Sequence, residues 1–123
     1  MLKLIFCLHR LPHLSRDEFQ RYWLDTHGPL VRRHGEALRI LRYVQSHAAG
    51  GPADEALQAS RGTAAGYDGV AELWWASAED FATATASAEG RAASLELLED
   101  ERRFIDMARS TLFVAAEHEV IGR

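Results

Sequence analysis

One short pattern occurs twice in this chain, each time directly after an apolar segment. The sequences SRDEF at 15–19 and SAEDF at 77–81 both read serine, any residue, two acidic residues and phenylalanine. Serine followed by acidic residues is typical of a helix N-terminus, where the side chain caps free N–H groups and the acids suit the helix dipole. The pattern therefore predicts two half-units, 1–48 and 67–123, within one domain of residues 1–123.

Four segments are predicted to be strands, because branched and aromatic residues alternate or run together in them. They are residues 1–9, 39–48, 67–75 and 112–121. Helices are expected over 15–26, 29–34, 77–90 and 91–108. This order indicates an α+β, ferredoxin-like βαββαβ fold, in which helices cover one face of a four-stranded antiparallel sheet.

The linker 49–66 is rich in glycine, alanine and serine, and a helical turn is expected near 55–60. It is either a surface crossover between the half-units or a lid over a pocket.

Strands 1–9 and 67–75 are apolar on both faces, although the helices can cover only one face of the sheet. A monomer would expose a large apolar patch, so we expect a symmetric homodimer with sheet packed on sheet. Adjacent strand residues point to opposite faces, so only one of Trp74 and Trp75 is expected to face the helices and the other the partner. Glu72, between apolar neighbours, needs a partner such as His118 or an arginine.

Composition excludes several classes of protein. The net charge is −4 with no basic block, which argues against a nucleic-acid partner. The lone Cys7 excludes an internal disulfide and fits a reducing compartment. The apolar stretch before His9 and Arg10 is too short for a signal peptide or membrane span. A cytoplasmic protein that does not bind membranes is therefore expected.

The segment SRDEFQRYWLDTHGPL at 15–30 carries the strongest candidate for chemistry. Phe19, Trp23 and His27 are spaced by four and share one side of a helix, which Gly28-Pro29 is expected to end. His27 is then either a general acid or base, with one ring nitrogen oriented by a neighbour, or a C-terminal cap that bonds the carbonyls of its own helix.

Aromatic and polar residues elsewhere are candidates for ligand contacts. Tyr43, Gln45 and His47 share one face of a strand, where they line a wet cavity or face solvent. Trp23 and Trp75 wall an aromatic pocket or belong to the core.

Phe104, near the apolar residues of the last predicted helix, is included among the ligand contacts. No zinc-ligand spacing, nucleophile elbow or phosphate-binding glycine motif occurs, so no metal or cofactor is expected.

Several segments together resemble the EthD family, of the dimeric α+β barrel superfamily. They are LKLIFCLHR, DEFQRYWLDTHGPL, RYVQSH, YDGVAELWW, DERRFID and LFVAAEHEVI. The H-G-P turn preceded by F-x-x-x-W is the most specific of these. The resemblance implies a homodimeric barrel with a cavity between helices and sheet, and it favours a functional His27. The family is linked to ethyl tert-butyl ether degradation, and the superfamily includes cofactor-free monooxygenases, polyketide cyclases and a lactone isomerase.

Two functions follow as hypotheses. The first is a cofactor-independent enzyme acting on a small aromatic or polyketide-like compound. In it His27 moves a proton, Trp23 and Trp75 wall the ring, and His47 or Tyr43 holds an oxygen. The second is a non-catalytic ligand-binding or stress-response dimer with the same cavity. An oxidoreductase role, which the resemblance also allows, has no support from individual residues.

Overall fold

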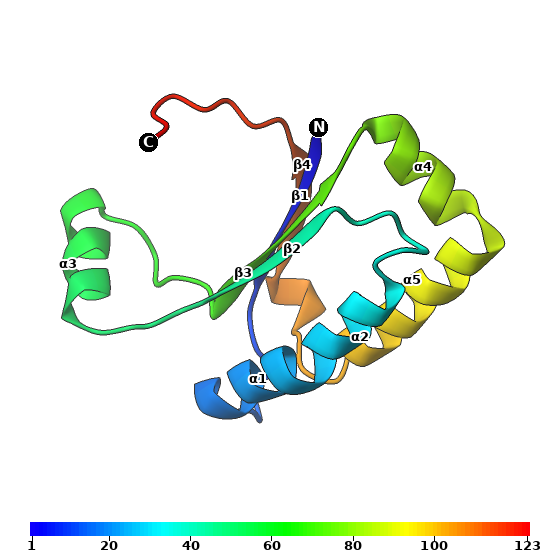
Figure 1. Cartoon of the computed structure of the whole chain (residues 1–123). Coiled ribbons are helices and arrows are strands. Elements are labelled where there is room, and N and C mark those ends of the chain that lie inside the picture. Colours follow the sequence, from blue (N-terminus) through cyan, green and yellow to red (C-terminus); the bar gives the residue numbers. More distant parts are fainter.

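A computed structural model describes all residues, 1–123 (Figure 1). Four strands form one antiparallel sheet in the order β2-β3-β1-β4. The strands are β1 (Leu2–Leu8), β2 (Arg42–His47), β3 (Gly69–Trp75) and β4 (Thr111–Ala115). This strand order is that of the ferredoxin-like fold, so the predicted α+β class is confirmed.

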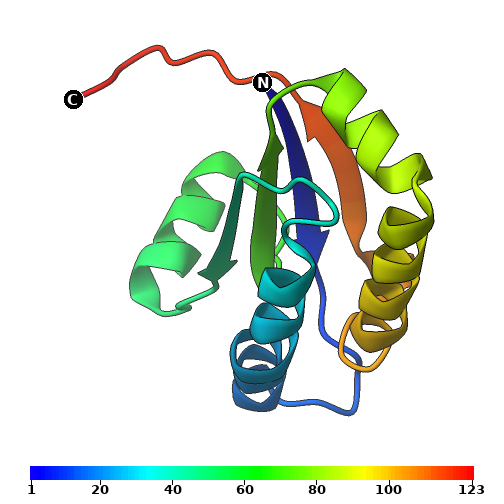
Figure 2. The same cartoon turned by 45° about the vertical axis from the view of Figure 1, so that its right-hand side comes forward.

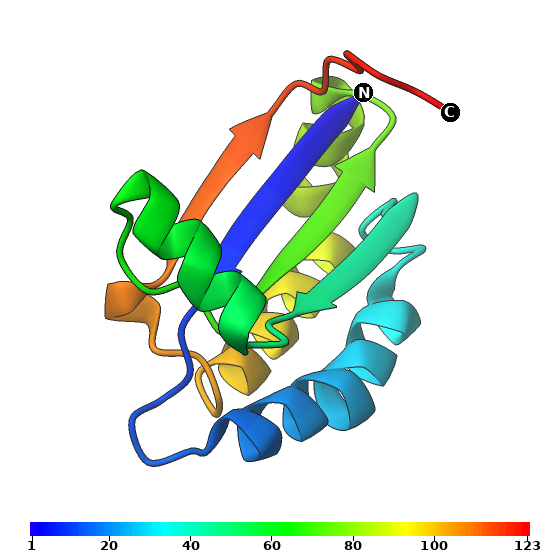
Figure 3. The ribbon, with the colours of Figure 1, turned by 90° about the vertical axis from the view of Figure 1, so that its left-hand side faces the viewer.

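Most helices cover one side of the sheet (Figures 1 and 3). These are α1 (Arg16–Tyr22), a π-helical turn (Trp23–His27), α2 (Gly28–His34), α4 (Ala78–Ala86) and α5 (Ala88–Glu101). Helix α3 (Pro52–Arg61) lies on the other side, and a 3₁₀ turn (Met107–Arg109) leads into β4. The linker 49–66 thus holds a full helix rather than a single turn.

The two serine patterns begin helices as predicted. Ser15 accepts a hydrogen bond from the N–H of Glu18, whose side chain accepts one from the Ser15 N–H in return. Ser77 accepts a bond from the N–H of Asp80 at the start of α4. These caps fix where the chain turns from strand to helix in each half-unit.

The expected helix end at Gly28-Pro29 is wrong. Gly28 is itself helical, with φ −53° and ψ −52°, and its N–H donates to the carbonyl of Trp23, five residues earlier. The chain thus passes from α1 through the wider π turn into α2, where Pro29 occupies the first turn that tolerates proline.

Two further boundaries differ from the sequence prediction. β4 ends at Ala115 rather than residue 121, because Ala115 pairs with Lys3 and β1 begins at Leu2, which leaves residues 117–121 without a partner on β1. The helix expected over 91–108 starts at Ala88 and ends at Glu101. Ile105 instead forms a β-bridge with Arg10.

The core between helices and sheet is built around aromatic rings. Phe19, Trp23 and Phe104 are at most 1% exposed, and Leu8 of β1 packs with them. The ring of Trp23 lies directly over Gly69 of β3, where an added Cβ would be 2.4 Å from the ring. A second cluster joins α2 and α5, which lie side by side in front of the sheet (Figure 2).

Helices α1, α2, α4 and α5 all lie on one side of the sheet and leave its other face uncovered (Figure 3). Trp75 faces the helices, where its ring meets Phe81 edge-on at 4.8 Å, and Trp74 lies on the opposite face, as predicted. Lys3 and Arg42 lie over the Trp74 ring at 4.8 Å and 4.7 Å.

Glu72 pairs with Lys3 rather than with His118 or an arginine, because Lys3 lies on the neighbouring strand β1, two residues from Ile5, the register partner of Glu72, and on the same face. No helix of the chain combines the length and apolar character that crossing a bilayer requires.

We expect Gly69→Ala to destabilise the protein by about 1–3 kcal/mol, because the new methyl group overlaps the Trp23 ring. Urea unfolding measures the change. Gly66→Ala is the control, since its Cβ would meet only Gln58 Nε2, at 3.4 Å. Equal stability of the two variants would show that the Trp23 ring has room to move.

Candidate functional site

His27 is buried, 4% exposed, and faces the last turn of α5. Its Nδ1 lies 2.7 Å from Oδ2 of Asp100, which is also 4% exposed. The Tyr22 hydroxyl donates to the other oxygen of Asp100 at 2.5 Å, and the His27 ring packs 5.1 Å from that of Phe104. His27 therefore bonds a carboxylate from another helix rather than the carbonyls of its own.

The protonation states of this pair follow from burial and hydrogen bonding. Burial would raise the pKa of Asp100, but hydrogen bonds from Tyr22 and His27 lower it below its usual value. Burial lowers the pKa of His27, in spite of the neighbouring carboxylate. At neutral pH the ring is therefore neutral, Nδ1 donates its proton to ionised Asp100, and Nε2 carries the lone pair.

Glu101 stands on the Nε2 side of the ring. Its Oε2 is 3.8 Å from Nε2, and its side chain is 21% exposed. Burial, and then the charge of Asp100, raises the pKa of Glu101 to about 7. The basic nitrogen of His27 thus faces a carboxyl group that exchanges its proton near neutral pH, which is the property expected of an acid–base pair.

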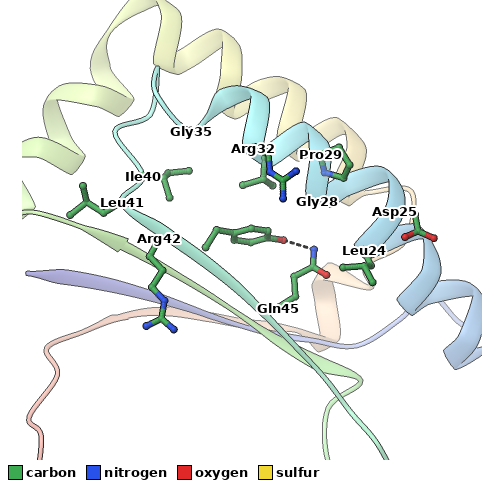
Figure 4. Close-up of a pocket in the computed structure, with 12 residues that line it drawn as sticks. Leu24, Asp25, Gly28, Pro29, Arg32, Gly35, Ile40, Leu41, Arg42 and Gln45 are labelled. Carbon is green, nitrogen blue, oxygen red and sulfur yellow. Dashed lines mark hydrogen bonds between the residues drawn. The ribbon is translucent and has the colours of Figure 1, made fainter.

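A pocket of about 650 Å³ opens between α2 and β2 (Figure 4). Its lining comes from the π turn, α2, the segment between α2 and β2, and β2. These residues are Leu24, Asp25, Gly28, Pro29, Val31, Arg32, Gly35, Ile40, Leu41, Arg42, Tyr43 and Gln45. The volume is in the range that holds a small organic molecule.

The floor of the pocket is polar and hydrogen-bonded. Nε2 of Gln45 donates to the Tyr43 hydroxyl oxygen at 2.8 Å and to the Trp23 carbonyl at 2.9 Å. Oε1 of Gln45 lies 2.8 Å from Nε2 of His47, whose ring stacks on Trp23 with centroids 4.4 Å apart. The stripe Tyr43, Gln45 and His47 therefore faces the helices and not solvent.

The pocket and the buried histidine lie on two sides of the same helical turn. Gly28 lines the pocket, whereas His27, the preceding residue, points toward α5 and is not part of the lining. The charge of Glu101, beside His27, also acts on Tyr43 in the pocket. Burial, with a further contribution from the charge of Glu101, raises its pKa to about 12, so the phenol stays protonated.

The structure brings the predicted site residues into two groups. Trp23, His47 and Tyr43 meet through Gln45, and His27 meets Phe104. Trp75 belongs to neither group. It is 3% exposed, and its Nε1 donates to the Leu38 carbonyl at 2.6 Å.

Sequence analysis missed Asp100 and Glu101 as partners of His27, and Tyr22 as the second hydrogen-bond donor to Asp100. The available signal was the pair of adjacent acids in DERRFID, which lies 73 residues from His27 in the chain. No three histidine, cysteine or acidic side chains converge closely enough to hold a metal ion.

We expect Glu101→Gln to stabilise the protein more at pH 8 than at pH 5. The pKa of Glu101 in the folded state, about 7, is above its ordinary value of 4.5, so its contribution to stability is complete below pH 4.5 and is lost as pH rises through 7. Glutamine does not ionise, so the variant keeps this part of the free energy of unfolding at pH 8. Urea unfolding at both pH values measures it, with exposed Glu99→Gln as the control on the same helix. The same pH dependence in wild type and variant would contradict this assignment.

Comparison with known proteins agrees with this architecture. Residues 11–108 match the model of the EthD domain. An EthD-family protein of Bacillus halodurans is 20% identical, with a TM-score of 0.61 over 96% of this chain and 100% of that one.

Two other solved structures extend the likeness. A hydroxynitrile lyase of Passiflora edulis is 14% identical, with a TM-score of 0.62 over 98% of this chain and 96% of that one. A dimeric ferredoxin-like protein of Thermobifida fusca is 13% identical, with a TM-score of 0.58 over 94% of this chain and 90% of that one. No curated protein matches the chain significantly. Because the domain match spans most of the sequence, this chain belongs to the EthD family.

Proposed function

We propose that this protein is a cofactor-independent enzyme acting on a small aromatic or polyketide-like compound, with His27 as its acid–base residue. The observation that carries the proposal is the buried pair of His27 and Asp100, with Glu101 on the free side of the ring. Burying two titratable groups costs stability unless they are paired, and sites that do so are enriched in catalytic residues.

The geometry supports a proton-transfer role. Asp100 fixes the tautomer of His27 and stabilises the imidazolium that forms when Nε2 takes a proton. Glu101, which exchanges its proton near pH 7, is the adjacent group that returns or removes that proton. Tyr43 remains a hydrogen-bond donor at all physiological pH values and is the candidate to hold a carbonyl or phenolic oxygen. Lyase chemistry in a protein of the same fold, the Passiflora enzyme, is compatible with this reading.

One observation favours the alternative of a non-catalytic ligand-binding or stress-response protein. His27 does not line the pocket between α2 and β2, so a ligand there meets Tyr43 before it meets the imidazole. In this alternative the pair of His27 and Asp100 joins α5 to the π turn and carries no chemistry.

We also propose that the protein is a homodimer that pairs the uncovered faces of two sheets. Ile5 and Phe113 are register partners on this face, and Phe113 is 51% exposed. Helix α3 projects on the same side, with Leu57 62% exposed, so it extends the apolar surface available to a partner (Figure 1). The Thermobifida protein of the same fold is described as dimeric.

We expect His27→Asn to lower cofactor-free turnover of small aromatic and polyketide-like compounds by at least about a hundredfold, because asparagine cannot accept the proton. The matched control is His34→Asn in α2, where the histidine bonds Glu96 at the surface. Thermal unfolding checks that both variants fold. Undiminished turnover in His27→Asn rejects the assigned role, and binding without turnover in the wild type favours the alternative.

We expect Phe113→Lys to convert the dimer into a monomer, since a charge on the uncovered face opposes sheet-on-sheet packing. Sedimentation velocity at micromolar concentration measures the change. The control is Leu95→Lys, which places the same charge on an exposed position of α5. A monomeric wild type, or a dimeric Phe113→Lys variant, would be inconsistent with this interface.

A further inference from the structure

Three consecutive basic residues end α2, and they differ in their partners. His34 Nε2 lies 2.9 Å from a Glu96 oxygen, and Arg33 is 3.9 Å from the other oxygen of the same carboxylate. The side chain of Arg32 forms no ion pair or hydrogen bond within the chain, yet it lines the pocket, and in Figure 4 its guanidinium points into the space above Gln45. The pocket thus contains a cation that nothing in the protein neutralises.

The floor of the same pocket offers a second unused donor. The Tyr43 oxygen accepts a hydrogen bond from Gln45, but no acceptor in the chain takes the hydroxyl proton of Tyr43. Gln45 is held from both ends, by Tyr43 and the Trp23 carbonyl on one side and His47 on the other, so the phenol is fixed in place. A ligand completes this network by presenting an oxygen acceptor to Tyr43.

The remaining walls suit a flat ring. Apolar side chains from the π turn, α2 and the segment before β2 line the pocket, and Gly28 and Gly35 add no side chain to it. The apolar residues are Leu24, Pro29, Val31, Ile40 and Leu41. A surface of this kind favours an aromatic ligand that lies between helix and strand.

Two other charged residues belong to the lining, and neither neutralises the charge of Arg32. The Arg42 guanidinium lies over Trp74, 4.7 Å from the ring, on the opposite face of the sheet. Asp25 precedes Gly28 by almost one turn and in Figure 4 stands at the far end of the pocket from Ile40 and Leu41, directed away from Gln45. The cationic end of the pocket is therefore set by Arg32.

We propose that the pocket between α2 and β2 binds a small aromatic anion, with an anionic oxygen at Arg32, an oxygen acceptor at Tyr43 and the ring against the apolar wall. This inference rests on the proposed function and narrows its substrate class from aromatic compounds in general to aromatic acids and phenolates. A bidentate carboxylate is the form that a guanidinium recognises best.

The test compares 2-naphthoate with 2-naphthamide, which has nearly the same shape and no charge. Isothermal titration calorimetry on the full chain measures both affinities in wild type, Arg32→Gln, Arg33→Gln and Tyr43→Phe. We expect the wild type to bind the acid about tenfold more tightly than the amide, and Arg32→Gln to lose that preference. Arg33→Gln is the matched control and keeps the preference. Tyr43→Phe weakens both ligands, because each offers an oxygen to the phenol.

Several outcomes overturn the ligand class. The first is equal affinity of the wild type for acid and amide. The second is an equal loss of the preference for the acid in Arg32→Gln and Arg33→Gln. The third is no binding of either probe at millimolar concentration. The proposed function has a separate readout, the loss of turnover in His27→Asn. If an aromatic substrate is turned over through His27 while acid and amide bind equally well, the proposed anionic ligand class is wrong and the proposed enzymatic function stands.

Discussion

The contact between the Trp23 ring and the backbone of Gly69 determines how the helices sit on the sheet. A methyl group at residue 69 would overlap the ring, so only glycine allows the π turn to approach β3 this closely. Trp23 also stacks on His47 and accepts, through its carbonyl, a hydrogen bond from Gln45. One residue of the first helical segment thereby fixes the separation between α2 and β2, and with it the width of the pocket.

The π turn has a second consequence, because it directs two neighbouring residues to different regions. His27 points toward Asp100 of α5, and Gly28 borders the pocket over Gln45. The turn also lets Pro29 follow without ending the helix. π turns are often found at functional sites because the extra residue redirects side chains without breaking the helix. Here it places the buried pair of His27 and Asp100 and the pocket on opposite sides of one helical segment.

Much of the fold follows from local sequence. The caps at Ser15 and Ser77, the four strands and the opposite orientations of Trp74 and Trp75 are all recognisable from residue spacing, because capping and strand alternation depend on near neighbours. The predicted ends of the helices and strands were less accurate. β4 stops at Ala115 because its partner strand begins, which is information that residues 116–121 do not carry.

The sequence by itself determined that Phe19, Trp23 and His27 share one side of the first helical segment. It also determined that Tyr43 and His47 share a strand face with Gln45. Only the tertiary structure decided their partners. Asp100 and Glu101 are distant in the chain, and the docking of α5 beside the π turn brings them to His27. The same packing sends Trp75 to Phe81 and leaves Arg32 without a carboxylate. Helical and strand periodicity are local properties, whereas pairing between buried charges depends on which elements pack together, and this is set by the whole core.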